Sequence, residues 1–149
     1  MRDRRDLAMM KRLADVQRAQ RVGAEAALGE AAEAEREARR AQEAALAKSR
    51  AAHRQWAEYL AEPGFSPEFS RALCAQVIER EAAADEAGSE TARRREAHEM
   101  REQEWQRLEA QVRQSETSVR RLGRRVARKQ DETAMSALSD RITWSWSRA

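Results

Sequence analysis

Few side chains in this sequence could support catalysis or bind a metal, and they lie far apart. The two histidines, His53 and His98, are isolated along the chain, and such residues serve more often as surface or packing residues than as metal ligands. Cys74 follows Leu73, which favours a small buried hydrophobe, and a single cysteine fits a reducing compartment. The sequence has no glycine-rich phosphate loop, G-x-S-x-G or Cys-x-x-Cys motif. We therefore predict no catalytic, cofactor or metal site and no enzymatic activity.

The acidic residues are abundant, but they alternate with arginine every three or four residues. This spacing is typical of ion pairs on a helix surface. Carboxylates that carry out acid–base catalysis need a concave, water-poor pocket, which a rod of two helices does not offer.

The distribution of arginine points to binding rather than to catalysis. Residues 118–130 carry six basic side chains and no acidic one, residues 1–22 carry seven basic and three acidic ones, and residues 23–47 have a net charge of −3. The first of these segments contains Arg120, Arg121, Arg124, Arg125, Arg128 and Lys129. Guanidinium groups bind carboxylates, and clustered positive charge steers an acidic partner. A solvated helix face is the alternative interpretation.

The composition indicates which elements carry these residues. The 149 residues include 31 alanines, 26 arginines and 20 glutamates, but only 19 Leu, Ile, Val and Phe residues and two prolines. This composition is typical of long helices or coiled coils and too poor in large apolar residues for a compact core. No apolar run is long enough to span a bilayer, and the amino-terminal residues do not resemble a secretory signal.

The only cluster of helix-breaking residues is at 62–67. Pro63-Gly64 marks a turn, and Ser66 followed by Pro67 reads as a helix N-cap. We predict helix 1 over about 2–61, a turn at 62–67, helix 2 over about 67–138, and a tail at 139–149. In the tail, Trp144 and Trp146 alternate with serine, so it is read either as frayed or as an aromatic plug that docks on a partner.

Apolar residues spaced by three and four predict the faces on which the helices meet. In helix 1 the predicted seam is Ala31, Ala34, Ala38, Ala41, Ala45, Lys48, Ala52, Gln55 and Tyr59. In helix 2 it is Trp105, Leu108, Val112, Ser115, Val119, Leu122 and Val126, extended backward through Arg101, His98, Arg94, Thr91, Ala87, Ala84, Arg80 and Val77 to Leu73. The polar middle of this list leaves two alternatives, a shift of register to Ala97 and Met100 or a locally weak seam.

Two helices joined by a short turn pack antiparallel. A turn centred at Gly64 and Phe65 places residue i opposite about residue 128 minus i. This rule predicts the pairs Val16–Val112, Met9–Val119, Leu13–Ser115, Tyr59–Phe69, Ala41–Ala87 and Ala45–Ala83. The predicted fold is therefore all-α, a single long antiparallel two-helix coiled-coil hairpin. Its two basic segments meet at the end that carries both termini, and Trp56, Phe65 and Phe69 lie near the turn.

Three segments resemble the central stalk proteins of type III secretion, called FliJ in flagella and YscO in injectisomes. They are Leu7-Ala-Met-Met-Lys-Arg-Leu13, His53-Arg-Gln-Trp-Ala-Glu-Tyr59 and the basic run from Arg120 to Lys129. The resemblance covers residues 1 to about 138. The turn and the opening segment look more like the injectisome form, although the sequence does not decide between the two branches.

The resemblance implies a cytoplasmic, non-enzymatic protein, peripheral at the inner-membrane export apparatus. Such proteins resemble the coiled coil of the rotary ATPase γ subunit; they insert their terminal end into the hexameric export ATPase ring, reach toward the export gate, and in some cases handle export chaperones. Ring contacts would fall on Arg4, Arg5, Arg120, Arg121, Arg124, Arg125 and Arg128, and contacts at the turn on Phe65, Phe69 and Trp56. We expect neither nucleic acid nor a membrane span. The alternatives are a basic coiled coil that binds nucleic acid and a self-associating structural coiled coil.

Overall fold

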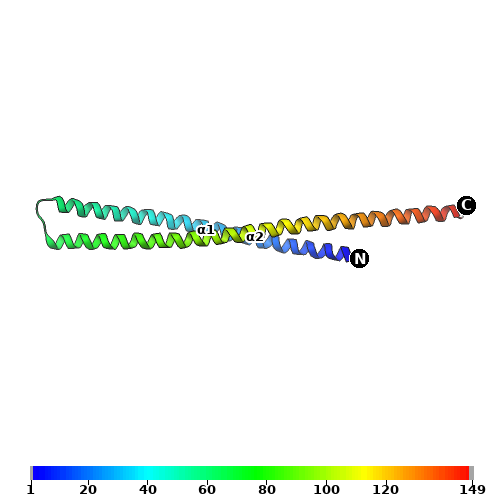
Figure 1. The fold of residues 1–149 in the computed structure, drawn as a ribbon, viewed down its shortest axis with the longest axis horizontal. Coiled ribbons are helices and arrows are strands. Elements are labelled where there is room, and N and C mark those ends of the chain that lie inside the picture. Colours follow the sequence, from blue (N-terminus) through cyan, green and yellow to red (C-terminus); the bar gives the residue numbers. More distant parts are fainter. Residues whose placement is uncertain (1, 148–149) are drawn as a thin grey trace. The chain divides into compact units, whose positions relative to one another are not determined.

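The computed structural model describes residues 2–147, which form two helices. Helix α1 spans Arg2–Ala61 and helix α2 spans Pro67–Ser147, and there is no strand in the described part of the chain. The helices run antiparallel on the two sides of the turn (Figure 1). The predicted all-α helical hairpin is confirmed.

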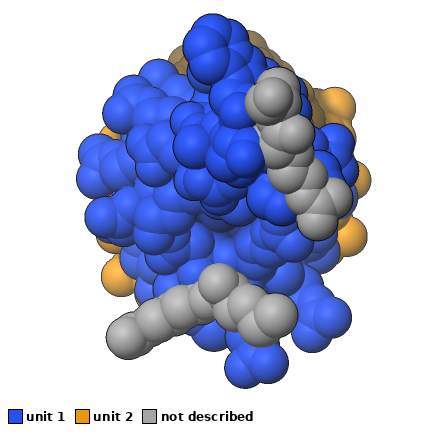
Figure 2. All heavy atoms as spheres, turned by 90° about the vertical axis from the view of Figure 1, so that its right-hand side faces the viewer, with its two compact units in different colours: residues 1–24, 105–149 blue, residues 25–104 orange. Residues whose placement is uncertain are grey.

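The helices contribute to two compact units, which Figure 2 colours separately. Unit 2, residues 25–104, contains the turn and is itself a helical hairpin. Unit 1, residues 1–24 and 105–149, pairs the first part of α1 with the second part of α2. In both units one seam between two helices provides the packing.

The turn has the local structure that its residues predict. Helix α1 ends at Ala61 and α2 begins at Pro67. Gly64 adopts a φ of 134°, a backbone conformation that favours glycine. The Phe69 amide donates to Ser66 Oγ at 3.5 Å, and the Ser70 amide donates to the Ser66 carbonyl at 3.0 Å. Ser66 therefore caps α2.

Burial along α2 follows the predicted heptad except at Arg94 and Arg101, which are exposed, so these two predicted seam positions are wrong. Within unit 1, Leu108, Val112 and Ser115 are buried. The buried or half-buried seam positions of α2 are Leu73, Val77, Arg80, Ala84, Ala87, Thr91, His98, Trp105, Leu108, Val112, Ser115, Val119, Leu122 and Val126. Met100 is 66% exposed and Ala97 is also exposed, so the alternative of a register shift is wrong.

The predicted seam of α1 is wrong at alternate positions. Ala41, Lys48 and Gln55 are exposed, and Gln42, Ser49 and Trp56 lie in the seam instead. Ala34 is half-buried, but its neighbour Glu35 is buried. The predicted positions Ala31, Ala38, Ala45, Ala52 and Tyr59 do lie on the seam. Alanines at both three- and four-residue spacings left the phase ambiguous, and the observed phase turns the large ring of Trp56 toward α2.

The helices are also offset from the predicted pairing by about one turn. In unit 1, Asp3 pairs with Lys129 and Gln17 with Ser115, and the residue numbers of each pair add to 132 rather than 128. The predicted pair Leu13–Ser115 is therefore wrong. The phase of α1 also differs from the predicted one near its start, where Met10, Ala14 and Gln17 lie in the seam and three other apolar side chains lie outside it.

Those three side chains are partly or mostly exposed: Met9 by 63%, Leu13 by 44% and Val16 by 55%. The pairs predicted for Met9 and Val16 are also wrong, because these exposed side chains lie outside the seam. In unit 2, Ala41 and Ala83 are exposed, so the predicted alanine pairs that include them are wrong as well. Tyr59 and Phe69 do meet, with ring centroids 4.7 Å apart in an edge-to-face arrangement.

A polar layer lies near the end of the unit 2 seam that is remote from the turn, where large apolar residues are absent from the seam of α2. His98 Nδ1 lies 2.6 Å from Glu35 Oε2, and Arg39 pairs with the other carboxylate oxygen. The hydrogen bond from His98, followed by that from Arg39, holds the pKa of Glu35 below its usual value of 4.5, although burial opposes this shift. The polar stretch of α2 is therefore matched by a buried acid on α1.

The predicted end of helix 2 near residue 138 is wrong, because α2 continues to Ser147. Three hydroxyls in the segment donate to helix carbonyls: Thr143 to Ser139 at 2.9 Å, Ser145 to Ile142 at 2.7 Å and Ser147 to Trp144 at 2.9 Å. Such bonds let serine and threonine remain in a helix. The alternation of tryptophan and serine is therefore compatible with helix, and residues 148–149 of the predicted tail lie outside the described residues.

Replacing Tyr59 with Phe tests the closure of the turn. The Ser66 amide donates to Tyr59 Oη at 2.7 Å, and the phenol donates to the Ser66 carbonyl at 3.3 Å. We expect Tyr59→Phe to lower the free energy of unfolding by about 1 kcal/mol, measured by urea denaturation. Phe65→Leu, at a side chain 62% exposed, is the control and should change little. Equal stability of wild type and Tyr59→Phe would contradict this role.

Replacing Glu35 with Gln tests the polar layer through its pH dependence. Because the pKa of Glu35 is lowered in the folded state, its ionised form stabilises the fold above pH 4.5, and this stabilisation is lost as the pH falls through the folded pKa. Wild type should be more stable than Glu35→Gln near neutral pH, and the denaturation midpoints should converge in acid. Glu37→Gln, at an exposed neighbour, should show no such convergence. A constant difference between wild type and Glu35→Gln at all pH values would contradict the prediction.

Candidate partner-binding surface

The start of α1 lies beside the basic segment of α2 in unit 1. An ion pair joins Asp3 to Lys129. The hydrogen bond from Lys129 lowers the pKa of Asp3, and the charges of Lys129 and Arg125 lower it further. The two basic segments singled out in the sequence are thus adjacent in the structure.

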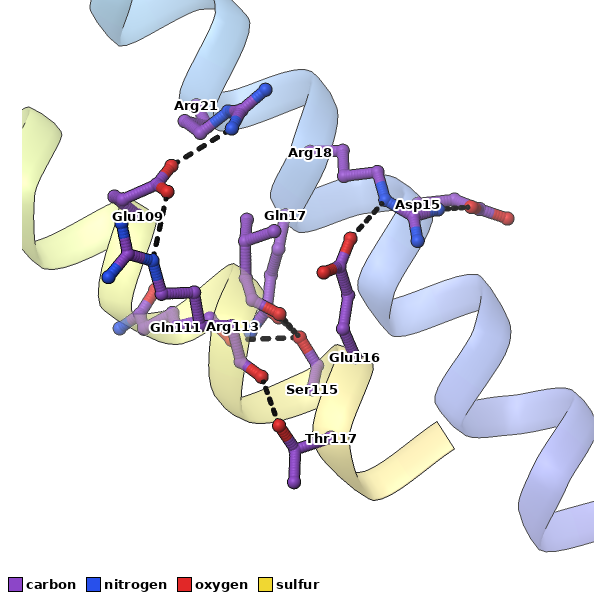
Figure 3. Close-up of polar contacts among 11 residues, drawn as sticks. Asp15, Gln17, Arg18, Arg21, Glu109, Gln111, Arg113, Ser115, Glu116 and Thr117 are labelled. Atoms are coloured by element: carbon purple, nitrogen blue, oxygen red, sulfur yellow. Dashed lines mark hydrogen bonds and ion pairs between the residues drawn. The ribbon is translucent and has the colours of Figure 1, made fainter. Parts of the chain in front are cut away.

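A second set of contacts aligns the two helices before the basic segment (Figure 3). Arg18 Nε donates to Glu116 at 3.0 Å, and Arg21 donates to Glu109 at 2.9 Å. Ser115, which is buried, bonds to Gln17 across the seam. Polar contacts therefore connect α1 to α2 along successive turns of unit 1.

Glu109 is the most enclosed carboxylate in this set. It accepts hydrogen bonds from Arg21 and from Arg113, the latter at 3.1 Å, and these bonds lower its pKa in that order. Its side chain is 19% exposed. A carboxylate held in this way stays ionised and tied to its arginines, so it serves to align the helices rather than to transfer protons.

The basic segment contains no acidic residue that could pair with its arginines. Ten arginines form ion pairs among the described residues, but Arg120, Arg121, Arg124, Arg125 and Arg128 form none, and the same holds for isolated arginines such as Arg12, Arg54 and Arg107. The five arginines of the basic segment are exposed, as are Arg4 and Arg5 on α1. A shallow hollow on the α2 surface is lined by Arg121, Leu122, Arg124, Arg125, Arg128, Lys129 and Glu132. The guanidinium groups of the arginines in this hollow are placed to bind an external anion or acidic side chain.

At the turn, the three aromatic residues singled out in the sequence have different environments. Phe65 is 62% exposed and Phe69 is 50% exposed, so both present ring surface to solvent. Trp56 is half-buried in the seam, and its indole nitrogen is enclosed without a hydrogen-bond partner among the described residues. This position favours packing for Trp56 and leaves Phe65 and Phe69 as the accessible pair.

Sequence reasoning singled out Trp146 as part of a possible docking plug but missed Met135, Leu138 and Ile142 as a surface continuous with it. Met135 is 67% exposed, Leu138 56%, Ile142 50% and Trp146 80%. Their spacing of three and four was the available signal, but it becomes visible only once the segment is known to be helical. Every residue from 127 to 147 is exposed.

The described residues hold no group of three or more His, Cys, Asp or Glu side chains that could bind a metal ion. Neither helix is long and apolar enough over any stretch to cross a membrane. Cys74 is a free, half-buried thiol.

A comparison with protein-family models, characterised proteins and solved structures finds no match for this chain.

Proposed function

We propose that this protein is a non-enzymatic stalk of a type III secretion export apparatus, which couples a hexameric export ATPase to the export gate. In this proposal it is cytoplasmic and peripheral at the inner membrane. The end that carries the start of α1 and the basic segment of α2 enters the ATPase ring. The turn with Phe65 and Phe69 contacts a component beyond the ring, and export chaperones are further partners.

The observation that supports this proposal best is the set of five exposed arginines without ion-pair partners among the described residues, placed beside the start of α1 by the Asp3–Lys129 pair. Arginine forks bind carboxylates, and a concentrated positive charge accelerates encounter with an acidic surface. Arginines such as Arg36, Arg93 and Arg113 pair with glutamates three or four residues away, whereas residues 118–130 contain no acidic residue. The charge at this end is therefore available to a partner.

The two helices suit a protein that transmits a conformational change along its length. Each of α1 and α2 is continuous over its whole described length. In unit 1 the seam is crossed by Arg18–Glu116 and Arg21–Glu109, which resist sliding of one helix past the other. A protein that passes on a conformational change needs such fixed alignment and no active site.

A second candidate function is the binding of nucleic acid through the same arginines. Phosphate contacts would give binding that falls steeply with salt and depends little on sequence. The antiparallel hairpin disfavours this candidate, because helices that read bases commonly fork from a parallel dimer. Binding to duplex DNA at physiological salt, together with no effect on the ATPase, would favour this candidate over the stalk.

The stalk proposal is tested by ATP hydrolysis of the export ATPase from the same organism. Wild-type protein should raise the hydrolysis rate or promote ring assembly, and Arg121→Glu/Arg125→Glu should abolish the effect. The matched control is Arg54→Glu/Arg71→Glu, which changes the net charge equally at exposed residues of unit 2 and should retain stimulation. Failure of the wild type to stimulate, or equal loss in both double variants, would overturn the proposal.

A further inference from the structure

The exposed apolar residues near the end of α2 lie on a single face of the helix. At about 100° of rotation per residue, Met135, Leu138, Ile142 and Trp146 fall within a narrow arc. The same arc continues toward the turn through Arg121, Arg124 and Arg128. We call this face, from Arg121 to Trp146, the outer stripe; it is about 38 Å long.

The outer stripe lies on the side of α2 opposite the seam. The seam residues Val119, Leu122 and Val126 are rotated by roughly half a turn from Met135 and Arg128. The outer stripe can therefore meet a partner without disturbing the contacts between α1 and α2. Beyond Lys129 the seam positions are Thr133, Ala137, Asp140 and Trp144, so Trp144 is the one large apolar residue among residues 130–147 that stays on the seam side, whereas the other four lie on the outer stripe.

The two halves of the outer stripe have different chemistry. The half nearer the turn carries three arginines without ion pairs among the described residues, and Arg120 lies at its edge. The far half carries four large apolar side chains that are each at least 50% exposed. Asp131 lies between the halves and Glu132 at one edge, so basic side chains outnumber acidic ones on this face.

A second copy of the chain does not match both halves. In a parallel pair of outer stripes, each arginine would meet the same arginine of the other copy, which is repulsive. In an antiparallel pair centred on the apolar half, Arg121, Arg124 and Arg128 would face no described residue of the other copy. Neither arrangement satisfies the apolar and the basic half together.

We infer that the outer stripe binds the surface of an anionic lipid bilayer, with α2 lying in the plane of the interface. A flat surface meets a straight helix face along its whole length at once. Apolar side chains such as Leu138 and Ile142 enter the boundary between headgroups and acyl chains, and Trp146 suits the same depth. Arg124 and Arg128 pair with anionic headgroups. This inference goes beyond the proposed function and does not depend on it.

Co-sedimentation of the full chain with vesicles tests the inference. We expect binding to vesicles of equal parts phosphatidylcholine and phosphatidylglycerol, weaker binding at high salt, and little binding to phosphatidylcholine alone. Leu138→Asp/Ile142→Asp should lower the apparent affinity by at least about tenfold. Arg124→Gln/Arg128→Gln should lower it for the anionic vesicles specifically. All four residues are exposed, so helix content measured by circular dichroism should stay unchanged.

The matched control is Ala137→Asp/Trp144→Asp, which adds the same charge and removes a tryptophan on the opposite side of α2. It should retain vesicle binding. No binding of the wild type to anionic vesicles would overturn the inference and leave the outer stripe as a contact for another protein. Equal loss in the control and stripe variants would also overturn it, as would a dimer in sedimentation that depends on Leu138 and Ile142.

Discussion

The alignment of α1 with α2 depends on polar contacts across a seam that buries little apolar surface. Much of the seam on α1 is alanine, and each buried methyl-sized group contributes only about 0.8 kcal/mol. Sliding one helix by a turn would therefore cost little apolar contact. It would, however, separate His98 from Glu35 and Gln17 from Ser115, and the two enclosed groups would keep only the bonds within their own helices. These layers specify the register more strongly than the alanines do.

This register determines which segment of α2 lies beside the start of α1. Because Asp3 lies level with Lys129, the start of α1 is beside the basic segment. The remainder of α2, up to Ser147, is exposed because α2, with 81 residues, is longer than α1, with 60. The register thus places the two basic segments side by side, and the unequal helix lengths leave the end of α2 uncovered.

The sequence predicted the structure correctly where a residue type allows few backbone conformations or only one phase of the helix. Proline and glycine placed the turn, and Leu108 and Val112 on α2 identified its seam, because large apolar residues at one spacing favour a single phase. On α1, alanines at several spacings fit more than one phase, and the deciding residues were polar. Gly88 lies where an added Cβ would come within 3.3 Å of the Gln42 amide nitrogen, so glycine permits a close approach between the helices there.

The face of α2 that carries large apolar residues changes along the helix, and this explains why the end of α2 was hard to interpret. From Trp105 to Val126 these residues face α1, whereas Met135, Leu138, Ile142 and Trp146 lie on the opposite side and Trp144 alone stays on the seam side. A helix with one partner along its whole length would keep its apolar residues on one face. The change occurs just past Lys129, where the contact with Asp3 ends the described pairing. The sequence of α2 therefore encodes two contacts on two faces, and the register of the hairpin sets where the first stops and the second becomes accessible.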